Sequence, residues 1–144
     1  MSKQQGSAST VGRLPVRAEL VFDSLRDPAP SGVRSSANGV RYLLFRAGPV
    51  VIDLRFEFKP DSERYSLSGQ AQSTEENAPQ LTGIPVSLRS DRTELLRTRT
   101  NQFGEFVLEE EIGRSVEIHL EVPEQNEIFI PLDEAFWQRS TAGL

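Results

Sequence analysis

Residues 50–59, VVIDLRFEFK, alternate apolar and charged side chains, and this alternation constrains the fold more than any other feature of the chain. Apolar residues stand at Ile52, Leu54, Phe56 and Phe58, and charged residues at Asp53, Arg55, Glu57 and Lys59. A period of two places alternate side chains on opposite faces of a pleated strand, whereas a helix needs a period near 3.6. The stretch therefore predicts a β-strand with one buried and one solvated face.

The same alternation recurs along the chain, with turn-forming residues between the runs. It predicts strands near 16–22, 41–46, 50–58, 64–72, 84–89, 94–100, 104–109, 115–122 and 126–132. The first run also fits one face of a short helix. A spacing of about 8–12 residues between turns is typical of sandwiches and barrels. We therefore expect an all-β fold, an antiparallel β-sandwich of about nine strands. Because Pro85 cannot donate a ladder hydrogen bond, we expect 84–89 to be an edge strand.

The chain of 144 residues predicts one domain with tails. Residues 1–12, rich in Ser, Gln and Gly, are expected to form a disordered tail, 13–132 a single β-sandwich domain, and 133–144 a C-terminal tail. The segment 23–39 has the composition of a long irregular loop.

Charge and composition exclude several classes of function. The chain has no cysteine, which excludes disulfides and thiolate metal sites. Residues 1–58 carry eight basic against five acidic residues, net +3, and residues 59–144 eight against sixteen, net −8. Such an acidic body argues against nucleic acid as a partner. No apolar run is long enough to indicate a signal peptide or a membrane-inserted segment. We therefore expect a cytoplasmic protein, with export by another route left open.

The stretch TNQFGEF, residues 100–106, has the composition of a tight turn. Asn101 can accept a hydrogen bond from the backbone two residues on, and Gly104 can supply a positive φ. Phe106 then resumes the inward-facing pattern. We interpret Asn101, Gly104 and Phe106 as a structural turn, and expect a hairpin that joins 94–100 to 104–109.

This turn and its neighbours resemble the carboxypeptidase regulatory-like domains, which are transthyretin-like, immunoglobulin-like β-sandwiches. Thr100, Asn101, Gly104 and Phe106 match the family's TDxxGxF signature, with Asn in the usual place of Asp. Segments 67–69, 82–88 and 116–122 resemble its strands, so the resemblance covers about residues 64–132. It implies the sandwich fold and a domain of bacterial type, and it is silent on activity. Strands 41–58 lie outside it, as an N-terminal extension of one sheet or a small lid.

His119 is the only histidine, and Glu117 and Glu121 flank it at strand spacing. The three side chains are expected on one face, where a metal site is conceivable. We favour a solvated charged face, because neighbours two apart along a strand chelate poorly without ligands from other strands. We predict no catalytic residue, no metal and no cofactor: a single histidine without a GxSxG motif does not fit a nucleophile triad.

Two further clusters have structural and functional interpretations. Arg89, Arg92, Arg97 and Arg99 are expected to pair across strands with Glu94, Glu105 and Glu117, and an anion-binding patch is the alternative. Phe136 and Trp137 lie in a polar tail. They either pack across the open end of the sandwich or form an aromatic anchor for a partner.

The leading functional hypothesis is a non-enzymatic protein-interaction or scaffolding module that binds a partner protein or self-associates, with strand addition to a sheet edge as the route. A small-ligand or carbohydrate-binding module is the first alternative, with Tyr42, Tyr65 and Trp137 as its Tyr and Trp stacking candidates. An enzyme that uses carboxylates on loops is ranked last.

Overall fold

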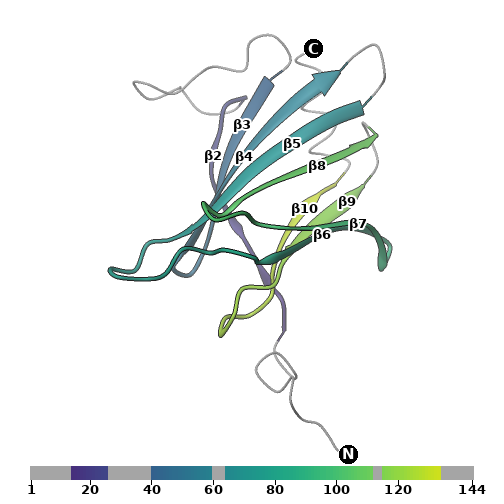
Figure 1. The fold of residues 1–144 in the computed structure, drawn as a ribbon. Helices are drawn as coiled ribbons and strands as arrows, with labels where there is room; N and C mark the ends of the chain where they lie inside the picture. The colour runs from purple at the N-terminus through teal and green to yellow at the C-terminus, as the bar shows by residue number, and fades with distance from the viewer. Residues whose placement is uncertain (1–13, 26–39, 60–63, 112–114, 134–144) are drawn as a thin grey trace, which may run out of the picture.

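The computed structural model of the chain describes residues 14–25, 40–59, 64–111 and 115–133. Within these ranges every regular element is a strand. The strands are β1 (Val16–Arg17), β2 (Glu19–Asp23), β3 (Val40–Ala47), β4 (Val50–Lys59), β5 (Arg64–Ser73), β6 (Pro85–Ser90), β7 (Thr93–Arg99), β8 (Glu105–Glu111), β9 (Val116–Leu120) and β10 (Ile128–Leu132). They form two five-stranded sheets: sheet A in the order β1-β10-β9-β6-β7, and sheet B in the order β2-β3-β4-β5-β8 (Figure 1). The predicted all-β sandwich is confirmed.

The core lies between the two sheets and is built from the alternating apolar residues. In β4, Ile52 and Phe56 are completely buried, and Ile118 and Ile130 are buried to the same degree in sheet A. Burial of one such side chain contributes about 1.5–3 kcal/mol. The period of two in the sequence therefore sets which face of each strand turns inward.

The predicted first strand, 16–22, divides into two strands that belong to different sheets. β1 pairs in parallel with β10, and β2 pairs antiparallel with β3. Ala18, the single residue between them, is buried, and its N–H donates to the carbonyl of Phe129 at 3.0 Å. The described residues thus form ten strands in place of nine, and the helical alternative for this run is wrong.

The N-terminal strands extend one sheet and do not form a lid. β3 pairs with β4 along the whole length of β3, and β4 pairs in regular register with β5, as at Leu54 and Gly69. Sheet B therefore continues without a break from β2, β3 and β4 into β5 and β8.

The prediction of an edge strand at 84–89 is wrong, because β6 lies between β9 and β7. Pro85 is the first residue of β6, and its carbonyl accepts a hydrogen bond from the N–H of Glu121 at 3.1 Å. A proline at the first position of a strand interrupts no bond in the interior of the ladder.

The predicted hairpin is also wrong, although the turn itself is confirmed. β7 belongs to sheet A and β8 to sheet B, so residues 100–104 cross from one sheet to the other. Asn101 Oδ1 accepts from the N–H of Phe103 at 2.8 Å and from that of Glu105 at 2.9 Å. Gly104 has a φ of 79°, and its carbonyl accepts from Ala71 N at 2.9 Å. The last bond ties the corner to β5 and directs β8 into sheet B.

Candidate functional site

A wide groove lies on the outer face of sheet B. Its volume is about 880 Å³, and it crosses β2, β3, β4, β5 and β8. Its lining residues are Val21, Phe22, Tyr42, Leu43, Leu44, Asp53, Leu54, Arg55, Ser68, Gly69, Gln70, Glu105, Phe106 and Val107. A volume of this size falls within the range of about 300–1,000 Å³ that is typical of ligand pockets.

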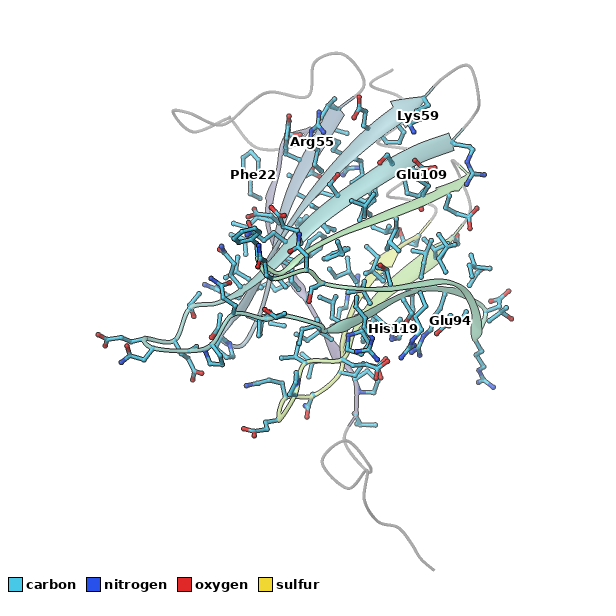
Figure 2. All side chains as sticks on the ribbon, viewed as in Figure 1. Phe22, Arg55, Lys59, Glu94, Glu109 and His119 are labelled. Atoms are coloured by element: carbon cyan, nitrogen blue, oxygen red, sulfur yellow. The ribbon has the colours of Figure 1, made fainter. Side chains whose placement is uncertain are left out.

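One row of cross-strand neighbours forms the middle of this groove, in the order Phe22, Leu44, Asp53, Gln70, Glu105. Directly opposed residues have Cβ atoms about 4.5–5.5 Å apart. A bulge in β2 leaves Val21 unpaired beside Phe22. Figure 2 shows Phe22 on the side of sheet B that faces away from sheet A. One end of the row is therefore apolar and the other polar, with a carboxylate between them.

The next row along the strands contains Tyr42, Arg55, Ser68 and Val107. A hydrogen bond with the Tyr42 side chain raises the pKa of Arg55, with a smaller contribution from the charge of Glu57. Arg55 Nη1 lies 3.5 Å from Glu57 Oε1. The guanidinium is therefore held beside a carboxylate that lies outside the groove.

Asp53 has a different environment from the other surface carboxylates. Its side chain reaches solvent in the groove, but the surrounding atoms displace enough water that desolvation raises its pKa above the usual 3.8. Leu44 is its partner on one side and Gln70 on the other. A carboxylate in such a setting gains from a cation that replaces the lost water.

A second feature of sheet B is the edge at β8, which is hydrogen-bonded to β5 and to no other strand among the described residues. Because the Gly104 carbonyl bonds to Ala71, the backbone groups of every second residue from Gly104 point toward β5. The N–H and C=O groups of Val107 and Glu109 therefore point away from β5. The Val107 side chain is 59% exposed.

His119 lies in a carboxylate clamp on the outer face of sheet A. Its Nε2 is 2.9 Å from Glu117 Oε1, and its Nδ1 contacts Glu127 Oε2. The ring of Phe129 stacks on the imidazole with centroids 5.9 Å apart, and Arg89 lies 3.6 Å from the same Glu127 oxygen. His119 is buried, so the prediction of a solvated position is wrong: Phe129 and Glu127 cover it.

Glu121 lies on the same outer face of sheet A as His119, as predicted, but it pairs with Arg97 at 3.2 Å rather than with His119. Arg97 in addition binds Glu94 at 2.9 Å, but both residues belong to β7, so this pair is not the predicted one across strands. The other two predicted acceptors are engaged elsewhere, Glu105 with Asn101 and Glu117 with His119. Among the residues that the structure describes, no group of three or more His, Asp or Glu side chains is arranged to hold a metal ion.

A buried ion pair lies beside a cavity of about 620 Å³ that residues of both sheets line. Asp23 accepts from Arg41 through Nε at 3.0 Å and through Nη2 at 2.5 Å, and from the N–H of Leu25 at 3.0 Å. Asp23 and Arg41 are 0% and 2% exposed. This bidentate pair fixes the end of β2 against β3, and we interpret it as structural.

Several sequence predictions fall outside the described residues. They are the tail at 1–12, the loop positions 26–39 and the aromatic pair Phe136 and Trp137. The structure also separates the two tyrosine stacking candidates: Tyr42 lines the outer groove, whereas Tyr65 is buried against Phe56 in the core, with ring centroids 5.7 Å apart. The two tyrosines therefore do not form one stacking platform.

The groove, Glu127 and the buried Asp23–Arg41 pair were not anticipated. One sequence signal for the groove exists: residues 42–45, YLLF, are continuously apolar, whereas a strand with one solvated face alternates. Such a run indicates apolar side chains on both faces of β3.

Comparison with known proteins gives no relative: no family model, curated protein or solved structure matches the chain. The described ranges also contain no helix with the length and hydropathy needed to cross a membrane.

Proposed function

We propose that the protein is a non-enzymatic interaction module that binds a strand of a partner protein at the free edge of β8. The observation that carries this proposal is the regular, one-sided pairing of β8 in sheet B. The resemblance to carboxypeptidase regulatory-like domains belongs to the same proposal, since the matching residues Asn101, Gly104 and Phe106 form the corner that places β8 at the edge.

The other three edge strands, β1, β2 and β7, each have a feature that opposes strand addition. β1 has only two residues. β2 carries a bulge at Val21, and a register shift interrupts the pairing of β7 with β6 next to Leu88. β8 pairs with β5 over seven residues without such a shift. It is therefore the edge best suited to receive another strand.

The charged side chains of β8 determine which partner strands fit this edge. The outward side chains of β8 include Glu105, Val107 and Glu109. If two copies of β8 paired antiparallel about Val107, Glu105 of one copy would lie opposite Glu109 of the other, and like charges directly opposed destabilise a sheet. A partner strand with lysine at every second position places lysines opposite Glu105 and Glu109 and reverses this interaction, so a strand that alternates lysine and valine fits the edge.

The contacts of the chemically reactive residues support a binding role over an enzymatic one. Both ring nitrogens of His119 contact carboxylates, and Asp23 is fully engaged by Arg41 and backbone. Each of these groups stabilises the fold through its contacts, which leaves the surface of sheet B as the place for recognition.

Titration of the ¹⁵N-labelled protein with a synthetic peptide, acetyl-KVKVKVK-amide, tests the proposal. We expect chemical-shift changes concentrated in β8 and its neighbour β5. The peptide acetyl-EVEVEVE-amide is the matched probe, and we expect it to bind about tenfold more weakly, because each reversed charge pair changes the free energy by a few tenths of a kcal/mol or more.

Two variants of one residue provide the control. Val107→Pro removes an N–H that faces away from β5, so it leaves the β5–β8 ladder intact but removes a donor for the added strand. Val107→Thr keeps both the N–H and the β-branched shape. We expect binding to be lost in Val107→Pro and kept in Val107→Thr. Equal binding by both variants, or peptide-induced shifts only in sheet A, would rule out strand addition at β8.

A further inference from the structure

The groove on the outer face of sheet B combines apolar walls with a carboxylate at its centre. The apolar part comes from Val21, Phe22, Tyr42 and Leu44 on β2 and β3. Phe22 is the second neighbour of Asp53 across β3, through Leu44. Aromatic rings attract organic cations through their negatively charged faces, in addition to their apolar contact area.

The charged groups of the groove favour a cation. Asp53 and Glu105 are acidic, and Arg55 is the basic member of the lining. Arg55 already interacts with Tyr42 and Glu57, and Glu105 accepts a hydrogen bond from the Asn101 amide at 2.9 Å. Gln70 lies between the two acidic residues, and its Nε2 donates to the carbonyl of Phe103 at 2.9 Å. Asp53 is therefore the carboxylate placed to receive a ligand.

We propose that this groove binds a small organic cation, whose ammonium or guanidinium group pairs with Asp53 while its apolar body lies against Phe22, Tyr42 and Leu44. This inference goes beyond strand addition at β8, since it concerns a different ligand and contacts on β2, β3 and β4 of the same sheet. The raised pKa of Asp53 supports it, because a desolvated carboxylate gains most from a cationic partner.

A simple arylalkyl amine is a suitable probe. We would titrate the full chain with 2-phenylethylammonium and follow backbone amides by ¹H–¹⁵N NMR at pH 7. We expect a dissociation constant of about 1 mM, because a ligand of this size supports only weak affinity. We also expect chemical-shift changes in the backbone amides of β3, β4 and β5. The neutral 2-phenylethanol and the anionic phenylacetate have the same ring, and we expect both to bind at least about fivefold more weakly.

Asp53→Asn is the decisive variant, because the amide keeps the shape of the carboxylate and removes its charge. We expect it to lower the affinity for 2-phenylethylammonium about fivefold or more, and to leave the affinity for 2-phenylethanol unchanged. Glu76→Gln, an exposed residue in the β5–β6 connection, removes the same charge away from the groove and is expected to bind like the wild type.

The outcomes separate this inference from the proposed strand addition. If 2-phenylethylammonium leaves groove amides unshifted, or binds Asp53→Asn as tightly as the wild type, the cation site is refuted, whatever the lysine–valine peptide does. If the cation binds as expected and the peptide does not, the cation site stands and strand addition is refuted. A loss of affinity in Glu76→Gln equal to that in Asp53→Asn would show that only the net charge matters, and would also overturn the site.

Discussion

The corner at residues 100–104 offers the sharpest test of how this fold is specified, through substitution of Asn101. Its side chain makes three hydrogen bonds: Oδ1 accepts from the N–H groups of Phe103 and Glu105, and Nδ2 donates to Glu105 Oε1 at 2.9 Å. A hydrogen bond contributes about 0.5–1.5 kcal/mol net. Because Asn101 is exposed, we use the lower half of this range, and expect Asn101→Ala to cost about 2 kcal/mol.

The substitution Asn101→Asp separates the contributions. Aspartate keeps both bonds from the backbone N–H groups, but replaces the amide donor with a second carboxylate beside Glu105. We expect a cost of about 1 kcal/mol, and expect the double variant Asn101→Asp, Glu105→Gln to regain most of it, because the new glutamine amide can donate to the aspartate.

Urea denaturation followed by circular dichroism measures these differences, and thermal unfolding provides a second measure. For a chain of this length, a loss of about 2 kcal/mol lowers Tm by about 4–8 °C. A cost below about 0.5 kcal/mol for Asn101→Ala, or equal costs for the alanine and aspartate variants, would refute the assignment of the corner's stability to these bonds.

Three further predictions follow from other contacts. Gly104→Ala is expected to lower the free energy of unfolding by about 2 kcal/mol or more, and Gly83→Ala by only about 1 kcal/mol. Both glycines have a positive φ, but only the new Cβ at Gly104 would meet backbone atoms. Equal losses in urea denaturation would contradict this. Asp23→Ala is expected to lower the free energy of unfolding by about 3–5 kcal/mol, because it leaves Arg41 buried without its carboxylate partner. Calorimetry can measure this loss, and a change below about 1 kcal/mol would disprove the prediction. Asp53→Asn is expected to be slightly more stable than the wild type at pH 7, because burial raises the pKa of Asp53 and so penalises its ionised form. This advantage should shrink as the pH falls through the raised pKa toward 3.8. Denaturation curves that show the same difference in stability at every pH would refute it.

Alternation in the sequence predicts most strands of this fold, because each strand turns one face to a core that lies between two sheets. It does not predict which strands become neighbours. The assignment of β6 to an edge failed because Pro85 is tolerated at the first position of an inner strand. The hairpin failed because Asn101 and Gly104 specify a tight turn, but the bond from Ala71 to Gly104 decides which sheet the chain enters next.

The candidate site was harder to predict, because it is assembled from neighbours across strands. Asp53 was recognised as an outward charge of β4, but its setting depends on Leu44 and Gln70, which only the register of sheet B places beside it. The clamp around His119 was half predicted: Glu117 lies two residues away in the same strand, whereas Glu127 comes from the segment before β10.

The parallel pairing of β1 with β10 has a consequence for biosynthesis. Val16 is the partner of Ile128, so residues near the two ends of the described chain meet in one sheet. During translation, β2, β3, β4 and β5 can assemble as soon as they leave the ribosome, whereas the outer edge of sheet A must wait until β10 has emerged. A nascent chain stalled before residue 128 would therefore expose the Val16 segment without its partner, and such a truncated product would be a natural target for chaperones.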